Sequence, residues 1–116
     1  MANKYLESRS ALPSSYSEFI ETHNGWEGDL GDDLGYAVLW DRQAIQDRWE
    51  SYEMSLYLGE RWFPFGSDGG GEIFCFDLPS RTDRVFTLPF IGMAAEKPIL
   101  RYESFAVVAE AILNRA

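Results

Sequence analysis

The chain has 116 residues, 46% of them hydrophobic and 16% aromatic, which is enough for one domain with a hydrophobic core. Its net charge of −9 has the wrong sign for engaging the phosphates of a nucleic acid. We expect neither a secretory signal nor a membrane anchor, because residues 1–15 are polar and the longest uncharged apolar stretch, residues 87–95, is too short to span a bilayer. The single cysteine, Cys75, cannot form an internal disulfide, which is typical of a reducing, cytoplasmic location.

Acidic charge is concentrated in the first half of the chain. Residues 1–60 carry twelve acidic and four basic side chains, whereas residues 61–116 carry seven and six. This asymmetry would steer the first half toward a basic partner. The alternative is that the acids serve only solubility, and charge by itself does not choose between the two interpretations.

The first predicted helix follows Leu12 and Pro13, since proline suits the first turn of a helix. It ends at Asn24 and Gly25, because both residues tolerate the left-handed conformation of a helix stop. We expect residues 1–10, which precede it, to be loosely ordered. Its apolar face has the i, i+3, i+4, i+7 spacing: Tyr16, Phe19, Ile20 and His23.

A second helix is predicted from Asp41, a good N-cap, to Gly59. Its apolar side chains form a narrow stripe that we expect to face the core: Ile45, Trp49, Tyr52 and Leu56. The other side carries Asp47, Glu50 and Met54. A third helix begins near Ser104 as its N-cap, and its predicted buried face consists of Phe105, Val108, Ala109, Ile112 and Leu113.

Four strands are predicted between these helices, at residues 36–40, 61–65, 73–76 and 85–88. Strands framed by helices predict one sheet with helices packed on it, in one domain over residues 1–116. The second strand is expected at an edge because Pro64 cannot donate a ladder hydrogen bond, and the third at the centre because it is apolar on both faces. Residues 89–100 fit no predicted element. The expected core includes Tyr16, Phe19, Ile45, Trp49, Phe74, Phe76, Phe105 and Ile112.

Residues 66–71 form a glycine-rich segment. A phosphate-binding loop would lead into a helix and place a lysine before a serine or threonine. Here the glycines lead into a predicted strand and no lysine follows, so a tight turn between strands is favoured. The nearby acids Asp68, Glu72 and Asp77 do not follow the spacing of a calcium-binding loop.

The residues needed for catalysis are scarce. One histidine, His23, and one distant cysteine are too few for a zinc site, and no Gly-x-Ser-x-Gly nucleophile motif is present. We expect His23 to cap carbonyls or pack on the core, and Cys75 to behave as a small inert hydrophobe. The sequence therefore predicts no enzymatic activity and no catalytic, cofactor-binding or metal-binding residue.

Residues 26–33 combine one tryptophan with four acids and several glycines, the composition of a mobile, charged loop. Functional loops often have this character, and tryptophan is enriched at the centres of protein interfaces. The alternative is a solvated loop with Trp26 folded onto the core. With the outer face of the second helix, this segment supplies the predicted partner-binding residues: Trp26, Glu27, Asp29, Asp32, Asp33, Asp47 and Glu50.

Three segments in order resemble the SUKH superfamily, the family of many bacterial immunity proteins and of the yeast cell-wall assembly regulator. Leu12, Pro13 and the helix up to Asn24 and Gly25 resemble its opening motif. Residues 62–77 resemble its glycine-rich central signature, although Glu72 stands where the family often has aspartate, and residues 102–105 resemble its terminal motif. The resemblance covers nearly the whole chain. It implies an α+β fold with a single mixed, mostly antiparallel sheet flanked by helices, and it implies no catalysis.

The resemblance also implies a function. Immunity members of the superfamily bind and neutralise a cognate toxin, often a nuclease, and an acidic inhibitor suits the basic cleft that a nuclease presents to phosphate. Under this interpretation the partner is a protein, a basic toxin domain. The alternative is a regulatory or scaffolding module that binds an endogenous protein. Neither interpretation involves direct contact with nucleic acid or membrane.

Overall fold

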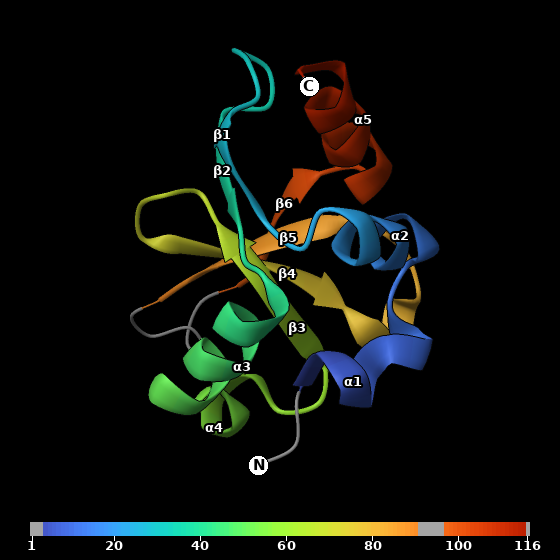
Figure 1. The fold of residues 1–116 in the computed structure, drawn as a ribbon. Coiled ribbons are helices and arrows are strands. Elements are labelled where there is room, and N and C mark those ends of the chain that lie inside the picture. The colour runs from blue at the N-terminus through green and yellow to red at the C-terminus, as the bar shows by residue number, and fades with distance from the viewer. Residues whose placement is uncertain (1–3, 91–96, 116) are drawn as a thin grey trace.

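An antiparallel sheet of six strands forms the centre of the fold in the computed structural model, which describes residues 4–90 and 97–115 (Figure 1). Each strand pairs with the next along the chain, so the order in the sheet follows the sequence. The α+β class predicted from the sequence is confirmed. In chain order the strands are β1 (Trp26–Asp29), β2 (Tyr36–Leu39), β3 (Trp62–Ser67), β4 (Glu72–Asp77), β5 (Val85–Pro89) and β6 (Ile99–Tyr102).

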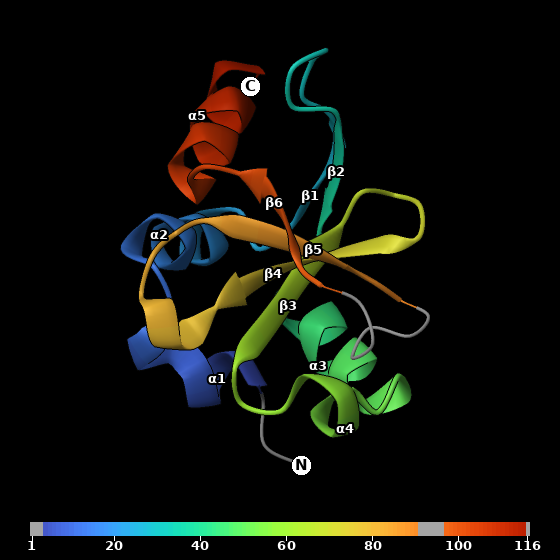
Figure 2. The same ribbon diagram turned by 180° about the vertical axis from the view of Figure 1, so that it is seen from behind.

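Helices surround this sheet. Helix α2 packs against α5, and α1 packs against α3. The hairpin of β1 and β2 rises from one end of the sheet beside α5, while α3 and α4 lie at the opposite end (Figures 1 and 2). The helical elements are α1 (Lys4–Ser8), η1 (Arg9–Ala11), α2 (Ser14–Thr22), α3 (Arg42–Ser51), α4 (Met54–Leu58), η2 (Leu78–Ser80) and α5 (Phe105–Arg115).

The core is a cluster of aromatic rings between α2, α5 and the central strands. The rings of Phe65 and Phe76 stack at 4.3 Å, and Tyr16 contacts both, at 5.1 and 5.2 Å between centroids. Phe105 of α5 packs against the same rings. Seven of the eight predicted core residues are buried, and the eighth, Trp49, is partly buried against the core.

The ends of the predicted helices agree with their capping signals. The Asp41 carboxylate accepts a hydrogen bond from the Ala44 amide at 2.7 Å, and the Ser104 hydroxyl accepts one from the Val107 amide at 3.3 Å. Asn24 adopts a left-handed φ of 47° just after α2. One residue of the third helix departs from its expected side, since Leu113 is 58% exposed.

The prediction that β3 lies at an edge is wrong, because β3 lies between β2 and β4. Pro64 is nevertheless accommodated without a ladder bond. Its pairing with β4 changes register between Pro64 and Gly66, and β2 pairs only with Gly66 and Ser67 farther along. The shift in register therefore lies next to Pro64, the one residue of β3 that has no backbone N–H to donate to a neighbouring strand.

The second predicted helix is broken in the structure. Glu53 takes a left-handed φ of 51°, which ends α3 and restarts the chain as α4 in a new direction. The 3.6-residue period does not carry across this break, so Met54 is buried while Leu56 is 74% exposed. Tyr52, the last residue before the break, is 49% exposed. The prediction that Tyr52 and Leu56 face the core is wrong, as is the outward assignment of Met54.

Apart from the short helical turns η1 and η2, three elements lie where the sequence predicted none. Residues 26–29, expected as a mobile loop, form β1, because backbone pairing with β2 orders a segment in which three of four residues, Glu27, Gly28 and Asp29, are disfavoured in strands. Residues 4–8, within the segment expected to be loosely ordered, form α1, and Tyr5 from it is 1% exposed in the core. Strand β6 ends the unassigned stretch of residues 89–100, of which residues 91–96 lie outside the described residues.

Candidate interaction surface

The acidic residues of the predicted loop lie on the hairpin of β1 and β2. Trp26, Glu27 and Asp29 belong to β1, and Asp32 and Asp33 lie in the turn that follows. The Asp29 carboxylate accepts a hydrogen bond from the Gly31 amide at 2.8 Å, and the Gly35 amide donates to the Gly31 carbonyl at 2.7 Å. The turn is therefore built from its own hydrogen bonds, and Asp32 and Asp33 project from it into solvent.

Strand β6, at the opposite edge of the sheet from β1, contacts the tip of this hairpin. The carbonyl of Leu34 accepts a hydrogen bond from the Tyr102 hydroxyl at 2.7 Å and another from the Arg101 guanidinium at 3.2 Å. The same guanidinium lies 5.7 Å from the centre of the Phe74 ring, which ties it to β4 as well. Asp33 directly precedes Leu34, so this arrangement displays the acids from a fixed position.

Trp26 is partly buried, between the two alternatives left open by the sequence. Its ring lies across Gly28, since a Cβ atom on Gly28 would fall 2.7 Å from Trp26 Cη2. Trp26 also packs against the core residues. One face of its indole is therefore used by the fold, and the remainder is accessible to a partner.

Asp47 and Glu50 lie on α3, at the opposite end of the sheet from the hairpin tip (Figure 1). Asp47 accepts a hydrogen bond from Gln43 at 2.9 Å, and Glu50 accepts one from Gln46 at 3.0 Å. The predicted partner residues are thus divided into a hairpin group and a helix group. Within the described residues, none of the six carboxylates in these two groups takes part in an ion pair.

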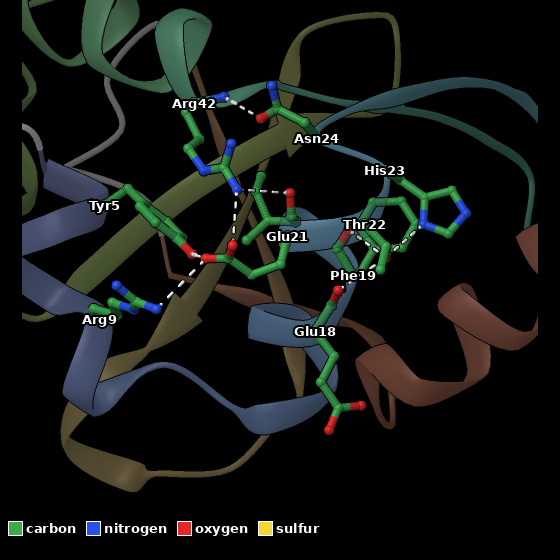
Figure 3. A network of polar contacts seen from close by, with 10 residues as sticks. Tyr5, Arg9, Glu18, Phe19, Glu21, Thr22, His23, Asn24 and Arg42 are labelled. Carbon is green, nitrogen blue, oxygen red and sulfur yellow. Dashed lines mark hydrogen bonds and ion pairs between the residues drawn. The ribbon is translucent and has the colours of Figure 1, made fainter.

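The carboxylate of Glu21 provides a contrast (Figure 3). It accepts a hydrogen bond from the Tyr5 hydroxyl at 3.0 Å and lies 3.3 Å from Arg42 and 3.6 Å from Arg9. Arg42 also donates to the Ile20 carbonyl at the end of α2. This network joins α1, α2 and α3, so the charge of Glu21 is already neutralised by arginines of the same chain.

His23 and Cys75, the two residues considered for catalysis, have contacts typical of residues that serve the fold. His23 is exposed, its ring stacks on Phe19 at 4.7 Å, and its Nδ1 lies 3.0 Å from the Thr22 hydroxyl (Figure 3). Cys75 is fully buried in β4, and desolvation raises the pKa of its thiol well above the ordinary value. A thiol held protonated in this way is a poor nucleophile.

The carboxylates around the glycine-rich turn do not converge. Asp68 Oδ1 accepts hydrogen bonds from the amides of Gly70 and Glu72, which closes the turn between β3 and β4. Asp77 lies at the far end of β4 and pairs with Arg61 at 3.1 Å. Among residues 4–90 and 97–115, no group of three or more His, Cys, Asp or Glu side chains is placed to hold a metal ion.

A groove between the hairpin and α3 was not foreseen from the sequence. It measures about 570 Å³, and its aromatic and apolar walls are Tyr36, Val38, Trp40, Tyr52 and Phe90. Tyr36 donates a hydrogen bond to the Glu27 carboxylate, which raises the pKa of Tyr36 above its ordinary value. The sequence carried no signal for this groove, because five separate segments contribute to it.

The part of the chain that the structure describes contains no helix with the length and apolar character needed to cross a bilayer. A comparison with curated proteins found no match. The family model described as the SMI1 / KNR4 family (SUKH-1) matches residues 7–109, which run from α1 into the last helix. The match includes the sheet, the glycine-rich turn and the helices around the aromatic core, and the chain therefore belongs to the SMI1 / KNR4 (SUKH-1) family.

Proposed function

We propose that this chain is a non-catalytic immunity protein of the cytoplasm, which binds and neutralises a cognate toxin through its acidic surface. The observation that carries this proposal is the set of carboxylates on the hairpin and on α3 that have no cationic partner among the described residues. Carboxylates that the fold does not neutralise remain available to a basic surface, such as the phosphate-binding cleft of a nuclease.

The electrostatics favour rapid capture of such a partner. With a net charge of −9, the protein attracts a basic domain over roughly 8–10 Å at physiological salt, and long-range attraction of this kind raises association rates. A toxin must be intercepted before it reaches its own substrate. A surface that acts mainly on the association rate suits this task.

The fixed position of the hairpin tip supports the same proposal. Leu34 is held by Tyr102 and Arg101, so Asp32 and Asp33 need little further ordering when a partner binds. Interfaces whose side chains and loops are ordered beforehand lose less entropy on association. The six carboxylates would serve as charged contacts, and Trp26 would supply an aromatic contact near the base of the hairpin.

The test uses the product of the gene adjacent to the one that encodes this chain. We expect that product to stop growth when it is expressed alone, and co-expression of this chain to restore growth. The purified pair should form a complex that weakens steeply as salt is added. A harmless neighbouring product that does not bind, together with a growth defect on deleting the chain in the absence of any toxin, would instead identify a regulatory module that binds an endogenous protein.

A further inference from the structure

The groove between the hairpin and α3 is lined by elements that also carry the two groups of acidic residues. Tyr36 and Val38 of β2 form one wall, and Tyr52 at the end of α3 and Phe90 after β5 form another. The rings of Tyr52 and Phe90 meet at 5.3 Å between centroids. Tyr36 and Tyr52 are 42% and 49% exposed, so both rings are accessible on the wall of the groove.

The floor of the groove shows which chemistry it accepts. The guanidinium of Arg48 lies 4.9 Å from the centre of the Trp40 ring, a cation–π arrangement within the groove itself. The described residues place no cation over the other three rings, which belong to Tyr36, Tyr52 and Phe90. Part of the aromatic lining is therefore occupied by the chain's own arginine, and the remaining rings have no cation over them among the described residues.

The carboxylate of Glu27 lies in the same groove as these three rings. Glu27 lines the groove, is exposed, and accepts a hydrogen bond from the Tyr36 hydroxyl, which orients its carboxylate. Glu27 has no ion-pair partner within the described residues. Aromatic rings beside an unpaired carboxylate form the surroundings that a guanidinium group prefers, because the ring faces and the carboxylate both carry negative potential.

We propose that this groove is the docking site for a segment of the basic partner that carries an arginine flanked by apolar residues. The inference rests on the proposed function, and it names the part of the partner that the surface recognises. The arginine pairs with Glu27, and its apolar neighbours bury against Tyr36, Tyr52 and Phe90. The opposite occupant, an acidic segment bound by Arg48, is disfavoured by the net charge of −9.

The probe is a pair of capped peptides of sequence Gly-Leu-Arg-Leu-Arg-Gly, one with arginine and one with citrulline, its neutral isostere, at both arginine positions. Titration into the isotope-labelled protein is followed by nuclear magnetic resonance. We expect the arginine peptide to shift the Trp40 indole signal and the amide signals of Gly69 and Gly70, which line the groove, in a saturable way. Binding of the citrulline peptide should be about tenfold weaker, because it lacks the charge-assisted contact.

Two variants identify the groups involved. Glu27→Gln keeps an oxygen that can accept from Tyr36 and should weaken the arginine peptide about tenfold, whereas Glu18→Gln, at an exposed position of α2, should leave its affinity unchanged. Arg48→Met removes the competing cation while keeping an apolar stem, and should tighten the arginine peptide about twofold or more.

Three results would overturn the proposal: equal shifts with both peptides, shifts confined to the hairpin tip at Asp32 and Asp33, or weaker arginine-peptide binding by Arg48→Met. The last result would mean that Arg48 supports the site rather than competing with the arginine of the peptide. The titration requires no toxin, so its failure is distinguishable from failure of the growth test. A chain that restores growth but does not bind the arginine peptide in the groove retains the proposed function and loses this docking site.

Discussion

Two hairpins of the same sheet have opposite surroundings. In the central hairpin, every residue of β3 is buried, and so are the four inner residues of β4. In the edge hairpin, β1 alternates between partly buried and exposed positions, and β2 begins at an exposed tyrosine. Figure 2 shows the central strands crossing the middle of the molecule while the edge hairpin extends away from it.

The difference separates residues that specify the fold from residues that are free to recognise a partner. A side chain buried between two layers is constrained in volume and polarity, since interiors are densely packed. An exposed side chain on an edge hairpin has no such constraint and can carry charge or an exposed ring at little cost in stability. Changes in the central hairpin should therefore act on folding, and changes in the edge hairpin on binding.

The largest effect is expected for Phe76→Ala in β4. Phe76 is fully buried and stacks on Phe65, so its removal leaves a cavity and should lower the free energy of unfolding by about 3–5 kcal/mol, measured by urea denaturation. Tyr36→Ala in the edge hairpin removes a ring of similar size and should cost less than about 1 kcal/mol. Similar losses of unfolding free energy in the two variants would mean that the edge hairpin contributes to stability as much as the central hairpin does.

Gly66→Ala tests the junction where the two hairpins meet. Gly66 lies opposite Leu39 of β2, and a Cβ atom there would fall 2.4 Å from the Val38 carbonyl oxygen, which is backbone and cannot turn aside. We expect a loss of about 1–3 kcal/mol in the free energy of unfolding. Gly71→Ala is the matched control, because a Cβ atom at Gly71 would meet nothing within 4 Å and should leave stability nearly unchanged.

Tyr102→Phe tests whether β6 holds the edge hairpin. The change removes the hydroxyl that donates to the Leu34 carbonyl and should cost about 1 kcal/mol. Hydrogen exchange should quicken at the Leu30 and Gly35 amides, whose hydrogen bonds form the tip. Tyr57→Phe, at an exposed position on α4, serves as the control. Unchanged exchange at the tip would mean that the hairpin is ordered without the hydrogen bond from Tyr102.

The elements that sequence reasoning predicted correctly are those with local signals. Pro13, Asp41 and Ser104 mark helix starts through the backbone groups beside them, and β4 is marked by an uninterrupted apolar run. Such features depend on neighbours within a few residues, so they can be read without knowledge of the fold.

The features that were missed depend on distant parts of the chain or on an unmarked conformation. Strand β1 contains glycine and acids and is ordered by pairing with β2. The break between α3 and α4 occurs at Glu53, where no glycine or asparagine signals a left-handed residue. The aromatic groove joins Tyr36, Tyr52 and Phe90 only after folding, and the sequence interpretation had assigned one of these to the core.

The smallest effect on stability is expected for the double charge reversal Asp32→Lys and Asp33→Lys at the tip of the edge hairpin. Both side chains are exposed and take part in no ion pair among the described residues, so the free energy of unfolding should change by no more than about 0.5 kcal/mol. Binding to the toxin should nevertheless slow, because exposed charges at an interface act mainly on the association rate and on its dependence on salt.

The measurement is the association rate constant at several salt concentrations, where the double variant should give a lower value at low salt and a flatter dependence. The matched control reverses Glu7 and Glu18 on α1 and α2, which changes the net charge equally but away from the hairpin (Figure 1). Trp26→Ala should instead speed dissociation, because its partly accessible ring is an aromatic contact. If both double variants slow association equally, attraction depends on total charge, and the hairpin tip is not the site of contact.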